Sequence, residues 1–179
     1  MMMPRRLPVS LIAACSLNRV IGKQGRLPWQ LPCDWAWFVT ATQGQVLIVG
    51  RKSFEEFGEP VPNRHTIVVS PSRATTTGEK WPHVHVVASL DAAIALAHDH
   101  PRYAQSNRVF VGGGERLYQE ALDRDLIESC YVTRVHQHIA DGDAFLPSWT
   151  SRCPELVFNA TTKASNGTSL SFGVWRKTN

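Results

Sequence analysis

The sequence predicts an α/β domain built around a largely parallel sheet. Short apolar runs alternate along the chain with segments of helical periodicity, a pattern typical of parallel strands joined by helices. The last two apolar segments instead flank Asn166-Gly167, and Asn-Gly is a strong signal for an antiparallel hairpin. The chain has 179 residues, 43% of them hydrophobic, which suits one domain with a substantial core.

In the first half of the chain, strands are predicted where short aliphatic runs are bounded by glycine or polar residues. These strands cover residues 9–14, 46–49, 66–70 and 85–87. Pro32 can open a helix that continues to about Ala41, because proline is favoured in the first helical turn. A short helix is predicted at Arg51–Phe57. Residues 15–31 have no steady periodicity and predict a long loop, which inside a compact domain is usually functional.

In the second half, Ser89 is placed to cap a helix. The apolar residues that follow it at helical spacing are Leu90, Ala93, Ile94 and Ala97. Further strands are predicted at residues 108–111, 130–135, 156–162 and 170–175, and a helix at 115–122. The last two strands alternate with period two around the predicted Asn-Gly turn. No repeat or linker divides the chain.

Bulk properties narrow the class of protein. No apolar run reaches the ~18 residues of a membrane helix, and the basic start lacks the apolar region of a signal peptide. We expect residues 1–8 to form a short flexible tail and residues 9–179 the single domain. The four cysteines, at positions 15, 33, 130 and 153, form no Cys-x-x-Cys pair, which fits reduced thiols in a cytoplasmic protein.

The basic character of the chain does not indicate a nucleic-acid partner. The net charge is +4 and the pI about 9.1, but the lysines and arginines are scattered rather than clustered. Binding of an anionic small molecule would explain the excess of positive charge, and so would a solvated surface with no function.

Asp34 is the candidate binding carboxylate. It follows Leu27-Pro28-Trp29 and Pro32 and precedes Trp35, Trp37 and Phe38, so it falls near the first turn of a helix among bulky apolar side chains. A carboxylate in that setting costs free energy unless a cationic or hydrogen-bonding ligand meets it, which would suit a flat, nitrogen-rich heterocycle. The alternative is that Asp34 caps a helix after Pro32.

Three strand ends carry chemistry suited to phosphate. They are Gly50-Arg51-Lys52-Ser53, Ser70-Pro71-Ser72-Arg73 and Gly112-Gly113-Gly114. Ligands bind beyond the carboxyl ends of parallel strands, and bare glycine backbone admits a pyrophosphate. Together they predict a dinucleotide, and the cations favour NADPH over NADH. The glycines do not match the Rossmann spacing, and a P-loop is absent.

Histidines pair as His83/His85, His98/His100 and His136/His138. On a strand, a spacing of two places both rings on one face, where they could chelate a metal. No cysteine lies nearby, and only Asp141 and Asp143 follow the last pair. Exposed strand histidines are the favoured interpretation, and no metal site is predicted.

The motifs taken in order resemble a known family. They are Ser10-Leu11-Ile12-Ala13-Ala14, Asn18-Arg19-Val20-Ile21-Gly22, Leu27-Pro28-Trp29, Asp34, Gly50-Arg51-Lys52-Ser53-Phe54, Pro60, Pro62-Asn63-Arg64, Gly113-Gly114, Tyr118, Thr133 and Gly142-Asp143. This order resembles dihydrofolate reductase of the chromosomal, NADPH-dependent kind, from about residue 9 to 175. The resemblance implies a mixed, mostly parallel eight-stranded sheet flanked by helices. It also implies an enzyme that reduces 7,8-dihydrofolate to tetrahydrofolate, which supports one-carbon metabolism and thymidylate synthesis. Such an enzyme is expected to be a monomer and to be inhibited by antifolates.

The resemblance assigns the substrate site. Asp34 would hold the pteridine and promote its protonation, with Trp29 ordering a water and Leu27 covering the ring. Arg64 would pair with the α-carboxylate of the glutamate tail, a task that suits a guanidinium fork. The other implied substrate contacts are Ile12, Ala13, Trp35, Phe38, Phe57, Val61, Gly112, Tyr118 and Thr133.

The resemblance also assigns the NADPH site, covered by a lid that runs from Asn18 to Leu31 and that Asp143 helps to hold shut. The implied cofactor residues are Ala14, Val20, Ile21, Gly22, Gly25, Arg26, Leu27, Gly50, Arg51, Lys52, Ser53, Ser70, Pro71, Ser72, Arg73, Gly112, Gly113, Gly114, Glu115, Arg116, Leu117 and Tyr118.

Three residues depart from the family pattern. Trp35 replaces Leu or Phe and would tighten the pocket, while Glu59 stands where a cation sometimes assists the glutamate tail. Gly112 stands where the family usually has an apolar residue, so either packing is lost or the register differs by one.

Two rival functions are a riboflavin-pathway reductase on the same fold and a non-catalytic protein that binds folate or nucleic acid. The first would lack the Leu27–Asp34 and Arg64 set, and the lid and cofactor motifs disfavour the second.

Overall fold

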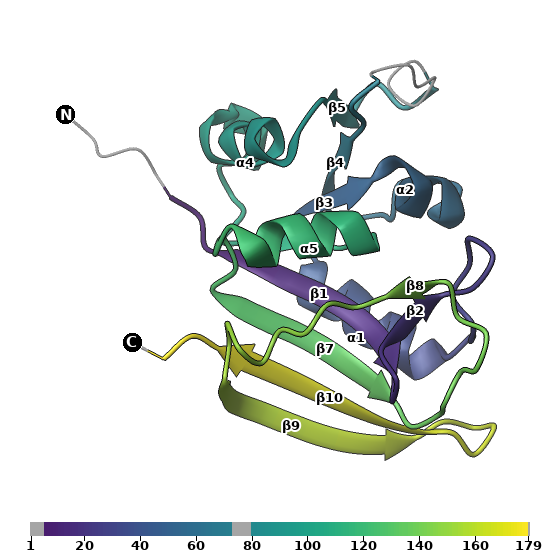
Figure 1. Ribbon diagram of the computed structural model, residues 1–179. Coiled ribbons are helices and arrows are strands. Elements are labelled where there is room, and N and C mark those ends of the chain that lie inside the picture. Colours follow the sequence, from purple (N-terminus) through teal and green to yellow (C-terminus); the bar gives the residue numbers. More distant parts are fainter. Residues whose placement is uncertain (1–5, 73–79, 179) are drawn as a thin grey trace.

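An eight-stranded sheet runs through the protein, which we describe from a computed structural model covering residues 6–72 and 80–178 (Figure 1). Its strands are β1 (Val9–Ser16), β3 (Val46–Gly50), β4 (His65–Val69), β5 (His85–Val87), β6 (Val109–Val111), β7 (Ser129–Val135), β9 (Glu155–Lys163) and β10 (Ser169–Arg176). Their spatial order is β5-β4-β3-β6-β1-β7-β10-β9. Neighbours from β5 to β7 are parallel, whereas β10 is antiparallel to β7 and β9. The predicted fold class is confirmed.

The central strands are aliphatic because both faces of the sheet are covered. β1, β3, β4 and β6 are buried along most of their length, as expected for parallel strands between layers of helices. Successive side chains point to opposite faces, so Ile48 contributes to one core cluster and its neighbours Leu47 and Val49 to the other.

Helices form the layers on the two faces. The described helices are α1 (Pro32–Thr42), α2 (Arg51–Phe57), α4 (Leu90–Asp99), α5 (Glu115–Asp123) and the 3-10 helix η1 (Pro101–Tyr103). On one face, α4 and α5 bury Leu90, Ala93, Leu117 and Ala121 in the larger core cluster. On the opposite face, α1 and α2 meet the second cluster, so that α5 lies in front of β1 in Figure 1 and α1 behind it.

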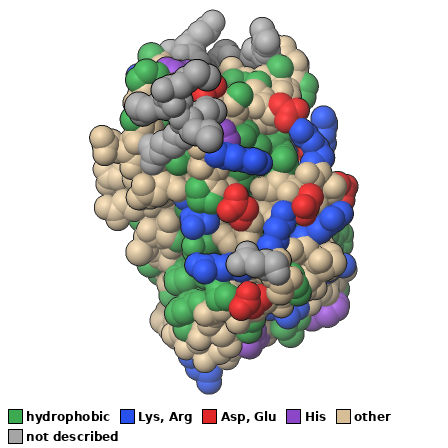
Figure 2. Space-filling view, turned by 90° about the vertical axis from the view of Figure 1, so that its left-hand side faces the viewer, with side chains coloured by type: hydrophobic (Ala, Val, Ile, Leu, Met, Phe, Trp, Pro, Cys, Tyr) green, Lys and Arg blue, Asp and Glu red, His purple; other side chains and the backbone are tan. Residues whose placement is uncertain are grey.

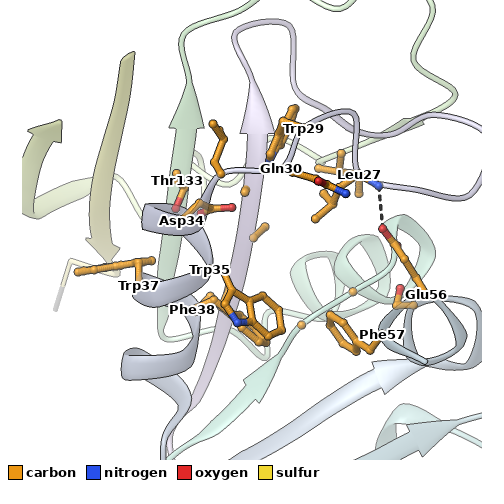
Figure 3. Close-up of a pocket in the computed structure, with 18 of the residues that line it drawn as sticks. Leu27, Trp29, Gln30, Asp34, Trp35, Trp37, Phe38, Glu56, Phe57 and Thr133 are labelled. Carbon is orange, nitrogen blue, oxygen red and sulfur yellow. Dashed lines mark hydrogen bonds between the residues drawn. The ribbon is translucent and has the colours of Figure 1, made fainter. Parts of the chain in front are cut away.

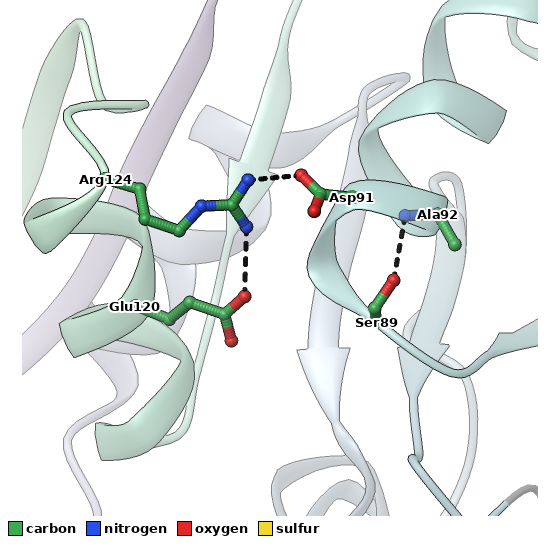
Figure 4. A network of polar contacts seen from close by, with 5 residues as sticks. All are labelled: Ser89, Asp91, Ala92, Glu120 and Arg124. Carbon is green, nitrogen blue, oxygen red and sulfur yellow. Dashed lines mark hydrogen bonds and ion pairs between the residues drawn. The ribbon is translucent and has the colours of Figure 1, made fainter.

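The helix predicted after Ser89 is confirmed together with its cap. The Ser89 hydroxyl accepts a hydrogen bond from the Ala92 amide at 3.2 Å. Beside this cap, Arg124 at the end of α5 contacts Asp91 of α4 and also Glu120 of its own helix (Figure 4). These contacts join the two helices that cover one face of the sheet.

The prediction of a structureless loop over residues 15–31 was wrong in part. Cys15 and Ser16 complete β1, and β2 (Val20–Gly22) pairs with β8 (Ala144–Phe145) in a small antiparallel sheet. Both strands are too short to show periodicity, and their pairing joins segments far apart in the sequence. The remainder of the segment is a loop that runs to α1.

The C-terminal hairpin forms at the predicted turn. Ala164 and Thr168 close it through a backbone hydrogen bond of 2.8 Å, and Gly167 has a positive φ of 85°. β9 is an edge strand and is exposed on both sides. Its Phe158 is 44% exposed and stacks on Trp37 of α1, with ring centroids 5.7 Å apart.

The N-terminal boundary differs from the predicted one. Residues 1–5 of the expected tail lie outside the described residues, but Leu7 is buried in the larger core cluster. The Pro8 carbonyl also accepts a hydrogen bond from the Val109 amide at 3.0 Å. The segment at Leu7 and Pro8 therefore belongs to the domain. Within the described ranges, no helix has the length and apolar character needed to cross a membrane.

Candidate active site

A cavity of about 490 Å³ opens where β1, β6 and β7 end and α1 begins. Its wall is mainly apolar, and aromatic side chains from α1 and α2 project toward it (Figure 3). Many residues predicted for the substrate or the cofactor line it together: Ile12, Ala13, Ala14, Ile21, Leu27, Trp29, Asp34, Trp35, Phe38, Ser53, Phe57, Gly112, Gly113, Gly114, Tyr118 and Thr133. The sequence motifs thus converge on one site.

Asp34 is the carboxylate of this cavity. It lies in the first turn of α1, which begins at Pro32 as predicted. Burial raises its pKa above the ordinary value, and hydrogen-bonding interactions with Thr133 and then Trp29 oppose the rise. The Trp29 indole nitrogen is nonetheless buried without a partner at direct hydrogen-bonding geometry. The site therefore holds an acid whose charged form is poorly solvated.

Polar groups near Asp34 come from the ends of the central strands. Thr133 on β7 is 1% exposed and pairs with Ala14 of β1 in the sheet register. The Tyr118 hydroxyl on α5 donates to the Ile12 carbonyl at 2.8 Å, and burial raises the pKa of this tyrosine. The floor is consequently polar at a few fixed atoms and apolar elsewhere, as is usual for small-molecule sites.

Three aromatic rings form one wall of the cavity. Trp35 lies 5.3 Å from Phe38 and 6.2 Å from Phe57, measured between ring centroids. The Trp35 side chain is 48% exposed at the mouth of the cavity. This wall can pack against a flat ring that extends outward from Asp34.

Arg64 lies beside the aromatic wall but does not line the cavity. Its guanidinium carbon is 5.9 Å from the Phe38 ring centroid, and one Nη donates to the Val39 carbonyl at 3.1 Å. The Nε and the other Nη are buried without a partner, and burial lowers the pKa of the group. Two donors on one guanidinium are thus free to bind a carboxylate. Val61 is 7% exposed and lines an adjoining cavity of about 920 Å³.

Gly113 and Gly114, which we call the glycine corner, lie against Ser53 of α2. The Gly50 amide donates to the Gly113 carbonyl at 2.7 Å. Gly113 has a φ of 130°, and a Cβ there would lie 3.1 Å from the Ser53 hydroxyl, so a side chain would be strained and crowded. At Gly112 a Cβ would lie 2.6 Å from Leu47 Cδ1. Leu47 therefore fills the space that a larger residue would take, and packing at Gly112 is not lost.

The segment predicted as a lid is held by carboxylates on two sides. Its turn is closed by reciprocal backbone hydrogen bonds between Lys23 and Arg26 of 2.9 and 3.1 Å. Asp143 accepts from the Gln24 amide at 2.7 Å, and Lys23 forms an ion pair with Asp141. On the opposite side, the Leu27 amide donates to Glu56 of α2 at 2.7 Å (Figure 3).

Several predicted cofactor residues lie outside both cavities for identifiable reasons. Val20 and Leu117 are core residues, and Ser70 is 1% exposed. Glu115 accepts a hydrogen bond from the Phe145 amide at 3.0 Å. The others outside are Gly22, Gly50, Arg51, Pro71, Ser72 and Arg116, and Arg73 falls outside the described residues. Gly25, Arg26 and Lys52 line the adjoining cavity.

Five residues that line this cavity were not predicted as site residues: Gln30, Leu31, Pro32, Trp37 and Glu56. Gln30 and Leu31 fall within the predicted lid. Trp37 lines the inner wall with its indole nitrogen buried and unpartnered, and it packs on Phe172 at 5.1 Å between centroids. Glu56 lines both cavities and holds the lid. Trp37 could have been found from its position one turn beyond Asp34 on the same helix, whereas no motif marks Glu56.

The histidine pairs do not lie on strands as expected. His83 precedes β5, and His136 and His138 follow β7. His85 hydrogen bonds to the Tyr103 hydroxyl in a cluster of rings far from the cavity. No group of three or more metal-ligating side chains is arranged for a metal within residues 6–72 and 80–178.

Comparison with known proteins agrees with this geometry. A profile of the dihydrofolate reductase family matches residues 8–177. Dihydrofolate reductase of Haemophilus influenzae is 36% identical over 155 residues, which are 87% of this chain and 88% of that protein. Dihydrofolate reductase type 3 of Salmonella typhimurium is 37% identical over 145 residues, 80% of each chain. The Bacillus subtilis dihydrofolate reductase is 34% identical over 149 residues, 83% of this chain and 81% of that one. This chain therefore belongs to the dihydrofolate reductase family.

Proposed function

We propose that this chain reduces 7,8-dihydrofolate to 5,6,7,8-tetrahydrofolate with NADPH. Family membership supports reduction of dihydrofolate. The observation that carries the proposal for this chain is the poorly solvated carboxylate of Asp34 inside an apolar cavity beneath the lid segment. Such a carboxylate binds a heterocycle that offers two adjacent N–H donors, because the ligand replaces the water that burial removes.

Asp34 would hold the pteridine through its amino group and the adjacent ring nitrogen. Its raised pKa means that it takes up a proton more readily than an exposed aspartate, and its charge favours a proton on the pteridine nitrogen next to the carbon that is reduced. Trp29, whose buried indole N–H lacks a direct partner, would order the water through which that proton passes. Leu27 would cover the ring and exclude bulk water.

The remaining substrate would follow the aromatic wall to Arg64. Trp35, Phe38 and Phe57 would pack on the aminobenzoyl ring. The unpaired Nε and Nη of Arg64 would supply hydrogen-bond donors to the α-carboxylate of the glutamate tail. Trp35, in place of a smaller residue, narrows this part of the site and would alter antifolate affinity.

The residues around the glycine corner fit a dinucleotide. Gly113 and Gly114 leave bare backbone beside Ser53 at the edge of the cavity, with Lys52 facing the adjoining cavity, and backbone amides and cations of this kind bind phosphate. Ala14 and Ile21 would contact the nicotinamide. When bound, NADPH supplies the hydride. The chain's part is to align the two rings and exclude water.

A spectrophotometric assay tests the proposal. Loss of NADPH absorbance is followed with the purified chain, with and without dihydrofolate, and with NADH in parallel. We expect oxidation that requires dihydrofolate and prefers NADPH. Binding of NADPH without dihydrofolate-dependent turnover would contradict the proposed substrate, and equal rates with NADH would contradict the phosphate assignment.

A further inference from the structure

One hydrogen bond crosses the mouth of the cavity. The Leu27 amide donates to Glu56 Oε1 at 2.7 Å, and Figure 3 shows Glu56 reaching from α2 toward the lid. Within the described residues, no other hydrogen bond or ion pair joins residues 20–31 to α2. The lid contacts with Asp141 and Asp143 lie at the other side, on the segment before β8. Glu56 is therefore the polar link that holds the lid against α2.

Glu56 is not engaged in an ion pair within the described residues, although Lys52 lies one turn before it on α2. The neighbouring Glu55, by contrast, contacts Arg51 at 3.6 Å. An ionised carboxylate accepts a shorter and stronger hydrogen bond from an amide than a neutral oxygen does. The link joins exposed groups, which weakens it through competition with water.

The amide that Glu56 holds belongs to the residue that covers the cavity. The Leu27 side chain is 42% exposed and lines both cavities, as does Glu56. Ser53, which lies against the glycine corner, is on the same short helix as Glu56. One helix thus connects the expected phosphate region to the lid residue above the expected nicotinamide.

We propose that Glu56 is a positioning residue that latches the lid through the Leu27 amide and so slows release of the cofactor. The inference rests on the proposed function for the identity of that cofactor. The latch itself is a property of the protein without ligand.

The test uses Glu56→Ala, Glu56→Gln and the control Glu59→Ala, which removes a neighbouring carboxylate at the adjoining cavity. Hydrogen exchange of the Leu27 amide is measured in the ligand-free full chain, and NADPH release is measured by stopped-flow displacement. We expect Glu56→Ala to accelerate both amide exchange and NADPH release by about threefold to tenfold. This is the range for loss of a hydrogen bond to a charged group that is weakened by exposure to water. Glu56→Gln keeps an acceptor oxygen and should fall between Glu56→Ala and the wild type, and Glu59→Ala should match the wild type.

The outcomes separate the two proposals. Unchanged Leu27 exchange in Glu56→Ala overturns the latch, whatever the wild-type activity. A wild type that fails to oxidise NADPH with dihydrofolate overturns the proposed function, while the exchange data still decide the latch. If Glu56→Ala does not fold, Glu56→Gln alone provides the test. A Leu27 amide that exchanges in Glu56→Gln at the wild-type rate would then overturn the proposal of a charged latch. Equal acceleration in Glu59→Ala would show a general charge effect and also overturn it.

Discussion

The cleft at α1 and the junction between α4 and α5 use the same residue types in opposite ways. At the junction, Arg124 donates from one Nη to Asp91 and from the other to Glu120 (Figure 4). Beside the cleft, Arg64 leaves its Nε and one Nη buried and unpaired. The first arginine is satisfied by the protein and joins two helices. The second keeps two donors without a partner, which is consistent with its proposed role in binding the substrate.

The carboxylates of the surface and of the cavity also differ in whether the protein stabilises their charge. Asp141 and Asp125 lie at the surface beside lysines, which lower their pKa values. Asp34 is enclosed by apolar side chains, and burial raises its pKa. Folding alone would favour the first arrangement, because unpaired buried polar groups are destabilising. Two of the buried unpartnered groups, the indole nitrogens of Trp29 and Trp37, line the cavity that holds Asp34, and the free donors of Arg64 lie beside it. Such locally unfavourable groups are expected where function outweighs stability.

The largest expected effect is on catalysis at Asp34. Asp34→Asn should lower dihydrofolate turnover at neutral pH by about 10²- to 10⁴-fold, the range for loss of an acid–base group. NADPH affinity should be retained, because Asp34 is proposed to contact the substrate and not the cofactor. The matched control is Asp91→Asn at the α4–α5 junction. Steady-state rates and NADPH titrations check both, and a near-normal rate in Asp34→Asn would refute the role of this carboxylate.

The second effect is on substrate affinity at Arg64. Arg64→Lys keeps the charge but loses the planar fork, so KM for dihydrofolate should rise by about tenfold or more. Because the tail lies far from the reacting ring, kcat should change little. Steady-state kinetics with dihydrofolate decide this point, and an unchanged KM would place the glutamate tail elsewhere.

The third effect is on stability and has the opposite sign from the first. The pKa of the Asp34 carboxyl is higher in the folded state than its ordinary value of 3.8. The contribution of this group to stability is therefore fully present below pH 3.8, and it is lost as the pH rises through the raised pKa. At pH 7, Asp34→Asn should therefore raise Tm, on a scale of about 2–4 °C for each kcal/mol in a chain of this size. The gain should shrink as the pH is lowered toward 4. Thermal unfolding across this pH range checks it, and a lower Tm for the variant at pH 7 would contradict it.

The smallest effect is expected at the junction. Arg124→Lys disturbs exposed ion pairs, which contribute little because water competes for both partners. Its Tm should remain within about 2 °C of the wild type, with kinetics unchanged. A loss of activity comparable with that of Arg64→Lys would remove the distinction between the two arginines.

The part of the site that could be predicted is local in sequence. Asp34 follows a proline that starts a helix, and Gly112–Gly114 follow a buried strand, so both could be located from neighbouring residues. The pairing of β2 with β8 and the contact of Glu56 with Leu27 depend on segments far apart in the chain. No pattern within either segment reports such contacts. The same holds for β9, whose alternation does not reveal that it is an exposed edge strand.

The placement of the six tryptophans has an experimental consequence. Trp29, Trp35 and Trp37 line the cavity, whereas Trp149 and Trp175 lie edge to face, 5.3 Å apart between centroids, in the core on the side of α4 and α5. Indole emission overlaps the absorption of a reduced nicotinamide, so occupancy of the cavity will quench the first group. Close and inclined indoles couple their strong far-ultraviolet transitions, so the second pair will give a dichroic couplet in that region that vanishes when the core unfolds. The unlabelled protein thus carries separate optical reporters of ligand occupancy and of folding.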